Sequence, residues 1–137
     1  MAAGAIEAMI NDYDAISKVI HTYIEGAKNG DVGLLREAFH PEARLFGAMK
    51  DGTRYDLDMK KFFKDSAAMP LNSHGGHYRA RLVSVRQFGP SAVAILAEDG
   101  CRGAVSFVDI FSLNQINGAW KIVNKTFTHT GGKAPAG

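Results

Sequence analysis

Apolar side chains in the first part of the chain recur at the spacing of an α-helix. Between residues 12 and 29 they fall on Tyr13, Ile16, Ile20, Tyr23 and Ala27. Intervals of three and four place these side chains on one stripe of a helix. Gly30, which readily adopts the left-handed conformation that ends many helices, comes directly afterwards. The pattern therefore predicts a helix over residues 12–29.

A second, shorter helix is predicted immediately after the first. Asp31 can cap it by accepting a backbone N–H of its first turn. Its buried side would carry Leu34, Leu35, Ala38 and Phe39. Pro41 stops the helix, because the residue before a proline is pushed out of helical geometry.

A hairpin and a third helix follow. The Asp-Gly pair at residues 51–52 is a strong signal for a tight turn between two strands. Asp56 or Asp58 can cap the next helix, which would turn Phe62 and Phe63 inward.

Beyond residue 77 the pattern changes to strands. Runs of alternating or β-branched residues cover residues 77–88, 91–98, 101–115 and 119–129. The turn signals between them lie at residues 89–90, 99–100 and 117–118. Short turns between successive strands indicate an antiparallel meander. The fold class predicted is α+β, with three N-terminal helices packed on one side of the sheet.

The strand predicted over residues 101–115 is apolar on both faces, since Phe107, Val108, Ile110 and Phe111 alternate between them. A strand of this kind is normally buried on both faces. One face would be covered by the helices, so the other is expected to meet a second copy of the chain in a homodimer.

The composition is that of one ordinary globular domain of 137 residues. We expect this domain over residues 11–130, between a flexible N-terminus at residues 1–10 and a disordered tail at residues 131–137. A formal net charge of +2 is too small to favour nucleic acid as a partner. The one cysteine, Cys101, excludes an internal disulfide framework and any site built from several thiolates.

The chain is expected to be cytoplasmic. Its Ala-rich beginning has no basic stretch and is interrupted by Glu7, unlike a signal peptide. The longest apolar run, residues 92–97, is far below the length that spans a bilayer, so no membrane partner is expected.

Several runs of the sequence resemble the nuclear transport factor 2-like superfamily. They are YIEG at residues 23–26, NGD at 29–31, AFHPEA at 38–43, DG at 51–52, FVD at 107–109 and GAWKIVNK at 118–125. Within the superfamily the chain is most similar to the branch called putative lumazine-binding, beside the SnoaL-like polyketide cyclases and ketosteroid isomerase-like proteins. The resemblance implies a cone-shaped, cystatin-like roll with a strongly curved mixed or antiparallel sheet, a pocket, and a homodimer.

Asp109 is the most informative candidate for chemistry, because it lies in the otherwise apolar run of residues 107–111. If its face of the strand lines the pocket, an apolar surrounding would raise the pKa of the carboxyl and suit it to general acid or base catalysis. Alternatively, a donor in the core or at a subunit contact satisfies this carboxylate.

Tyr13, Tyr23 and His129 complete the catalytic candidates. In the related isomerases and dehydratases, pocket tyrosines and carboxylates polarise a carbonyl or move a proton, so the resemblance pairs Tyr13 or Tyr23 with Asp109. His129, at the end of the last strand, would be a second proton carrier or simply a half-exposed terminal histidine. Candidates for lining a pocket that takes a small apolar or aromatic ligand are Phe39, Phe46, Phe63, Phe107, Trp120 and Phe127.

The remaining histidines favour structural roles. His40 precedes Pro41 at a corner between helix and strand, and His74 and His77 flank two glycines of a loop. None of them stands at the spacing of a metal site, so no metal and no cofactor are expected.

Two functions remain open from the sequence. The first is a small-molecule pocket protein, either a ligand binder or a cofactor-free isomerase, cyclase or dehydratase that works by acid and base chemistry. The second is a non-catalytic dimerisation or protein-association module with a vestigial cavity. An open pocket lined by Asp109 and a tyrosine would favour the first, and a cavity filled by Phe and Trp side chains the second.

Overall fold

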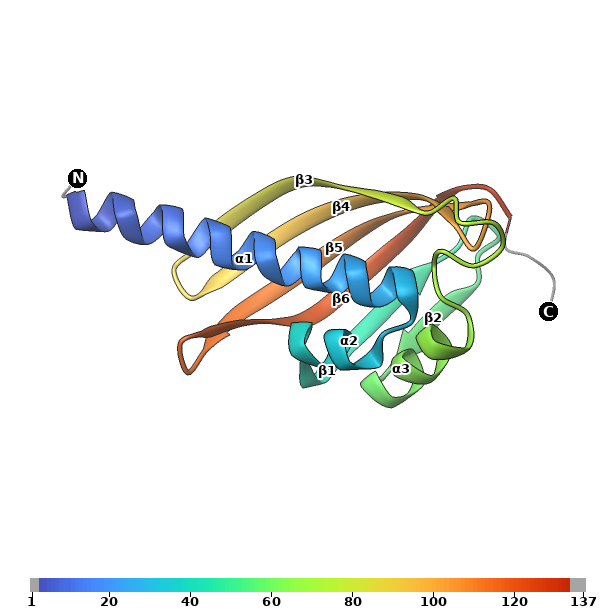
Figure 1. Cartoon of the computed structure of the whole chain (residues 1–137), viewed down its shortest axis with the longest axis horizontal. Coiled ribbons are helices and arrows are strands. Elements are labelled where there is room, and N and C mark those ends of the chain that lie inside the picture. Colours follow the sequence, from blue (N-terminus) through green and yellow to red (C-terminus); the bar gives the residue numbers. More distant parts are fainter. Residues whose placement is uncertain (1–2, 134–137) are drawn as a thin grey trace.

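The computed structural model describes residues 3–133, in which three helices lie against one face of a single curved sheet (Figure 1). The helices are α1 (Ala3–Asn29), α2 (Val32–Ala38) and α3 (Met59–Ala68). The strands are β1 (Phe39–Ala48), β2 (Arg54–Leu57), β3 (Arg79–Phe88), β4 (Ser91–Cys101), β5 (Val105–Ile116) and β6 (Ala119–Gly131). The predicted α+β class is therefore confirmed. The expected disordered tail lies largely outside the described residues.

The strands form one mixed sheet in the order β2-β1-β6-β5-β4-β3. The four C-terminal strands pair as the predicted antiparallel meander. The hairpin of β1 and β2 extends the same sheet, because β1 pairs with β6 in parallel. This pairing places the hairpin beside the last strand, so that residues distant in sequence converge on one face.

The helix boundaries follow local capping chemistry. Asp31 accepts a hydrogen bond from the backbone N–H of Leu34 at 3.2 Å, and Asp58 accepts one from Lys61 at 2.9 Å. Gly30 ends α1 with a φ of 68°, in the left-handed region that favours glycine. These caps fix the three helices close to the positions that the sequence predicts.

The first helix begins at Ala3 instead of near residue 12, so it includes most of the segment expected to be a flexible N-terminus. Figure 1 shows its first turns projecting beyond the sheet, and Ile16 is the first fully buried residue among those of the helix whose burial is described. Alanine has the highest helix propensity, in agreement with a helical Ala-rich beginning. The apolar stripe marks only the part of α1 that packs on the sheet.

The turn between β4 and β5 lies after Cys101, although the sequence predicts it at Asp99 and Gly100. Asp99 is paired with Arg79 of β3, and Cys101 with Val105 of β5. Gly100, with a φ of 63°, forms an irregularity inside the strand. Gly100 therefore marks a β-bulge and not a turn, and its neighbours Asp99 and Cys101 remain paired with β3 and β5.

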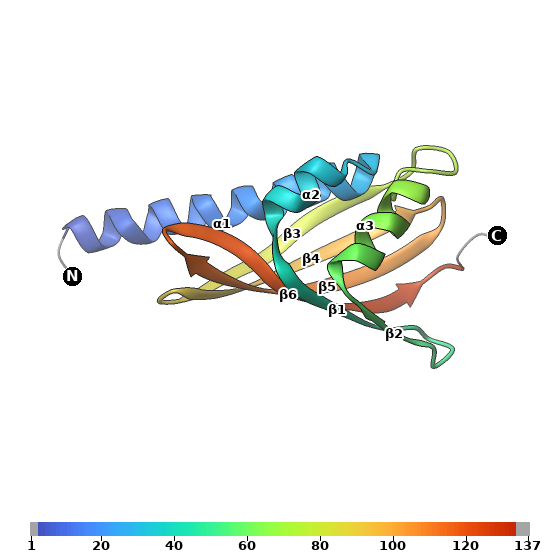
Figure 2. The same cartoon turned by 90° about the horizontal axis from the view of Figure 1, so that it is seen from below.

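The core fills the space between the helices and the inner face of the sheet. Its fully buried members include Ile16, Ile20, Tyr23, Leu35, Leu45, Leu96, Phe111, Leu113 and Ile122. Figure 2 shows all three helices on one side of the sheet, so the other side is open in the single chain. There Ile110 is 41% exposed, whereas its neighbour Phe111 is completely buried. No described helix is both long and apolar enough to cross a membrane.

Candidate active site

A cavity of about 190 Å³ lies between α1, α3 and the inner face of the sheet. Most of its walls are apolar, with Leu45, Leu57, Phe62, Val105, Phe107 and Phe127 among them. The polar side chains that reach it are Tyr23, Asp65, Ser66, Glu98, Arg102, Asp109 and Lys125. The space is thus an apolar container with a few polar groups, which is typical of a small-molecule site.

Three buried polar side chains meet at one end of the cavity. Lys125 Nζ donates a hydrogen bond of 2.7 Å to the Tyr23 hydroxyl, which donates one of 3.3 Å to Asp109 Oδ2. Lys125 Nζ also lies 3.7 Å from the same carboxylate oxygen. Tyr23 and Asp109 are completely buried, and Lys125 is nearly so. A buried phenol thus bridges a carboxylate and an ammonium group.

The register of the sheet brings these residues together. On β5 and β6, Asp109 is opposite Phe127 and Phe111 is opposite Lys125, so all four share the inner face. Tyr23 reaches them from α1 across the core, where its ring packs edge-on against Phe111 at 5.0 Å between centroids. Sheet pairing and helix packing together position the cluster.

The Lys125 ammonium group lies among aromatic rings. Its nitrogen is 4.9 Å from the ring centre of Tyr23, 5.4 Å from that of Phe62 and 5.2 Å from that of Phe127. The faces of these rings carry negative charge density, as does the neighbouring Asp109. The Lys125 nitrogen is therefore surrounded by negative charge density at the cavity wall.

Glu98 of β4 is a second buried carboxyl group beside the cluster. The Tyr78 hydroxyl donates to Glu98 Oε2 at 2.5 Å. Burial raises the pKa of Glu98, and the neighbouring Asp109 carboxylate raises it further. Burial also raises the pKa of Tyr23 and Tyr78, so both phenols remain donors. The site contains more carboxyl groups than its one lysine neutralises.

Arg102 enters the cavity from the turn after β4. Its φ of 50° lies in the left-handed region, which is unfavourable for a residue with a side chain. Its backbone N–H donates to Leu71 O at 2.7 Å, and its Nε donates to Met69 O at 3.1 Å. None of the ion pairs among the described residues includes Arg102. The guanidinium group is thus held at the cavity with a charge available to a ligand.

The structure places the residues expected at the site in three groups. Asp109, Tyr23, Phe107 and Phe127 line the cavity. Phe39, Phe63 and Trp120 are buried in the core, outside the lining. Phe46 is 38% exposed and Tyr13 is 52% exposed, and neither belongs to the lining.

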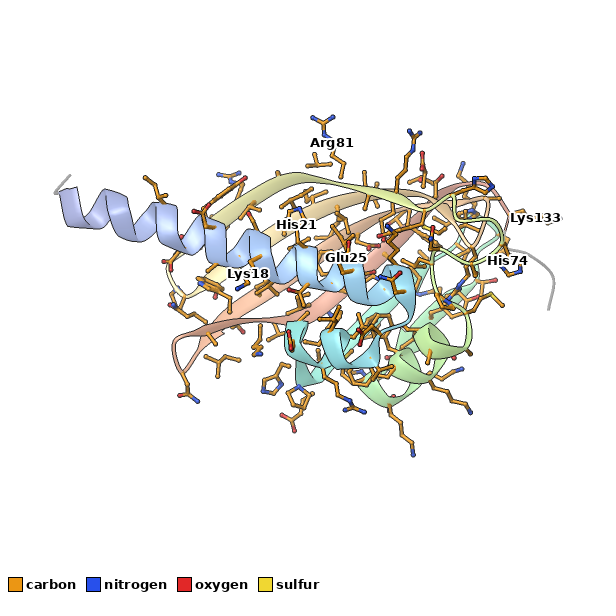
Figure 3. The ribbon with its side chains drawn as sticks, in the orientation of Figure 1. Lys18, His21, Glu25, His74, Arg81 and Lys133 are labelled. Atoms are coloured by element: carbon orange, nitrogen blue, oxygen red, sulfur yellow. The ribbon has the colours of Figure 1, made fainter. Side chains whose placement is uncertain are left out.

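His129 is held at the end of β6 instead of in the cavity lining. Its Nδ1 accepts a hydrogen bond from the backbone N–H of Lys50, and its Nε2 lies 2.9 Å from Gly131 O. His74 and His77 are exposed in the loop before β3, and Figure 3 shows His74 there. Within residues 3–133 no three His, Cys, Asp or Glu side chains are grouped to hold a metal ion.

Four site residues were not identified from the sequence: Lys125, Glu98, Tyr78 and Arg102. The alternation of β6 carries a signal for Lys125, because it lies two positions before the inward Phe127. Glu98 lies two positions after the buried Leu96 in the same way. Tyr78 and Arg102 lie just outside regular strands, where alternation gives no information.

These features define a class of protein: a curved α+β roll that encloses an apolar cavity with buried charged groups in its wall. The chain belongs to the family described as putative lumazine-binding, whose model matches residues 11–128. It is also similar to the protein named Aldolase FrzH from Cladobotryum sp, with 23% identity over 117 residues. That match covers 85% of this chain and 90% of the relative.

Solved structures share the fold. An NTF2-like protein of unknown function from Shewanella baltica has a TM-score of 0.79 and 26% identity, over 89% of this chain and 96% of that one. An NTF2-like protein of unknown function from Methylobacillus flagellatus has a TM-score of 0.74 and 25% identity, over 89% of this chain and 94% of that one. A protein with a cystatin-like fold from Caulobacter vibrioides has a TM-score of 0.62 and 18% identity, over 87% and 89%. The predicted membership in the NTF2-like superfamily is confirmed.

Proposed function

We propose that this protein binds a small carbonyl compound in the cavity and catalyses proton transfer at the carbon beside the carbonyl, without a cofactor. The observation that carries the proposal is the buried contact of Tyr23, Asp109 and Lys125 at the wall of an apolar cavity. Proton abstraction from such a carbon needs a base and a group that stabilises the enolate oxygen. The cluster offers both.

Asp109 is the base in this proposal. It is the carboxylate of the cluster, it is completely buried, and it lines the cavity in which the substrate would lie. When the ketone binds, the Tyr23 hydroxyl turns its one proton from Asp109 to the carbonyl oxygen, which frees the carboxylate to act as base. The Lys125 ammonium donates toward the same oxygen, where negative charge develops as the proton leaves. Lys125 has two N–H groups beyond the one bonded to Tyr23, because an ammonium carries three donors.

The cavity supports a ligand of one or two rings. A cavity of about 150 Å³ accommodates benzene, and this one, at about 190 Å³, is moderately larger and partly open. Its apolar walls favour a hydrophobic body, and Arg102 favours an acidic substituent. The family description suggests a small-molecule ligand, and lumazine itself is a bicyclic heterocycle with carbonyl groups. Aldol chemistry, in the name of the Cladobotryum relative, also proceeds through an enolate.

Hydrogen–deuterium exchange tests the proposal without knowledge of the natural product. 2-Tetralone and 2-indanone are incubated with the protein in D₂O, and NMR follows the loss of the proton signals beside the carbonyl. The protein should accelerate exchange above the buffer rate. Asp109→Asn should abolish the acceleration, whereas Asp14→Asn, at an exposed position of α1, should preserve it. Binding of both ketones and of lumazine is measured in parallel by titration of tyrosine and tryptophan fluorescence.

The outcomes separate catalysis from binding alone. Exchange at the buffer rate, although a ketone binds, would overturn the catalytic part of the proposal and favour a ligand binder. Borohydride reduction with the ketone present tests an imine route, and Lys125 should remain unmodified because the proposal gives it the role of a hydrogen-bond donor and not that of a nucleophile. A reduced ketone adduct on Lys125 would show that the reaction proceeds through an imine and would overturn the proposed acid and base mechanism.

The alternative function, a non-catalytic association module, is less well supported. Such a module needs no open cavity, whereas here Phe107 and Phe127 lie at the wall and leave the space open. Absence of binding by every small molecule in the panel would favour this alternative.

Association of two copies of the chain is part of the proposal. On the open face of the sheet, Ile95 of β4 pairs with Ile110 of β5, which is opposite Thr126 of β6, and Thr126 is opposite Phe46 of β1. This row of mainly apolar side chains crosses four neighbouring strands, and a second copy is its proposed partner. Light scattering should give twice the chain mass of 14.8 kDa, and Ile110→Arg should give the single mass. A wild-type monomer would overturn the dimer.

A further inference from the structure

Glu98 and Asp109 are adjacent buried carboxyl groups on paired strands. Leu96 is opposite Asp109 and Glu98 is opposite Phe107 in the antiparallel pair of β4 and β5. Glu98 and Asp109 are therefore diagonal neighbours on the inner face, within reach of each other's side chains. Both are buried, Asp109 completely.

The hydrogen bonds around the pair leave one oxygen without a donor. Asp109 Oδ2 accepts from Tyr23, and Glu98 Oε2 accepts from Tyr78. Asp109 Oδ1 is buried and has no hydrogen-bond partner among the described residues. A buried carboxylate oxygen without a donor is costly. A proton on Glu98 would supply that donor, since the two residues are diagonal neighbours on the same face of the sheet.

The balance of charge at the site also favours a proton on Glu98. The titratable groups that face Glu98 are Tyr78 before β3, Tyr23 of α1, Asp109, Lys125 of β6, and Cys101 with Arg102 at the end of β4. Tyr23, Tyr78 and Cys101 are neutral, because their pKa values are all raised. Lys125 is the buried cation and lies beside Asp109. Arg102 donates to Met69 O and takes part in no ion pair among the described residues, so two buried carboxylates would have Lys125 as their one ion-pair partner.

We propose that Glu98 is protonated at neutral pH and donates a hydrogen bond to Asp109 Oδ1. The buried pair then consists of one carboxylic acid and one carboxylate, and the charges of Asp109 and Lys125 balance. Glu98 is a positioning residue in this arrangement: it orients the Asp109 carboxylate and keeps a second negative charge away from it. The protonation of Glu98 is a property of the free protein. Its effect on catalysis, through the position of Asp109, rests on the proposed function.

NMR of protein labelled with ¹³C at the glutamate carboxyl carbons tests the protonation directly. The chain has five glutamates, at positions 7, 25, 37, 42 and 98. One carboxyl resonance should remain in its protonated position at pH 7, while the other four are ionised. The experiment needs no variant and no ligand. Five ionised carboxyls at pH 7 would overturn the proposal.

Substitution assigns the resonance and tests the positioning role. Glu98→Gln should remove the protonated signal, and Glu25→Gln, on the exposed side of α1 in Figure 3, should retain it. In the ketone exchange assay, wild-type activity should fall over the pH range in which the protonated Glu98 resonance titrates. Glu98→Gln keeps a neutral donor and should lose that fall. An alkaline fall that persists in Glu98→Gln would exclude Glu98 as its cause. A protonated Glu98 without ketone exchange would overturn the proposed function alone.

Discussion

Lys125 Nζ lies 2.7 Å from the Tyr23 hydroxyl oxygen, although the two residues are 102 positions apart in the chain. One comes from the last strand and the other from the first helix, so this contact joins the two ends of the fold inside its core. Asp109, on the neighbouring strand β5, completes the cluster. Because buried charges are stable only with their partners, the cluster links stability to the chemistry of the site.

Removal of the Lys125 charge should destabilise the protein. Lys125→Met leaves Asp109 without its cation, and breaking a buried pair in this way costs about 3–5 kcal/mol. Urea unfolding should show the loss, and Lys64→Met, at an exposed position of α3, should be close to wild type. The double variant Lys125→Met with Asp109→Asn should recover part of the stability. Additive losses in the double variant would contradict coupling between the two groups.

The Tyr23 hydroxyl should matter for catalysis more than for ligand binding. Tyr23→Phe removes a donor to the enolate oxygen, and loss of such a donor lowers turnover by about 10²–10³-fold. Ketone exchange should slow by that order while ketone affinity changes little. Tyr13→Phe on the same helix is the matched control, because Tyr13 is half-exposed and outside the cavity. Equal effects of the two variants would argue against a catalytic hydroxyl at position 23.

Gly47 of β1 should be required for the shape of the cavity. A Cβ atom at this position would lie only 2.0 Å from the Phe127 ring. Gly47→Ala therefore forces Phe127 to move, at a cost of about 1–3 kcal/mol for overpacking. Urea unfolding measures the loss, and fluorescence titration should show weaker ketone binding. Gly131→Ala, where the nearest side-chain atom is 4.0 Å away, should leave both properties near wild type.

Glu98 should make the protein less stable as the pH rises. Its pKa in the folded protein is raised above the ordinary value of 4.5, so the folded state holds a proton that the unfolded chain releases. This contribution is complete below pH 4.5 and is lost as the pH rises through the folded pKa. Urea unfolding at a series of pH values should show a shallower decline for Glu98→Gln than for wild type. Parallel declines would contradict the raised pKa.

Arg102 should favour ligands with an acidic substituent. A hydrogen bond to a charged group contributes about 1.5–3 kcal/mol, which corresponds to an affinity change of about 10–100-fold. Arg102→Gln should therefore weaken the binding of a bicyclic keto acid by this factor and leave the binding of the uncharged 2-tetralone nearly unchanged. Arg81→Gln, whose side chain projects from β3 away from the cavity in Figure 3, is the control. An equal loss of affinity for the keto acid and for the neutral ketone would indicate a structural role for Arg102.

The positions of the elements follow largely from local sequence. The apolar stripe of α1, the caps Asp31 and Asp58, and the turn at residues 51–52 act over a few residues, so periodicity and capping predict them. The turn after β4 shows the limit of local signals. Gly100 has the required backbone freedom, but pairing of its neighbours with β3 and β5 decides whether it forms a turn or a bulge.

Local patterning along the chain is enough to predict the fold class and to single out Asp109 as a carboxylate in an apolar strand. It did not determine the companions of Asp109, because contact between Tyr23, Glu98 and Lys125 depends on strand register and on helix packing over long separations. Alternation assigns each of these residues to a face, but only the tertiary structure decides which faces meet. Burial then gives the cluster its charge balance, since removal from water makes each charge depend on its neighbours.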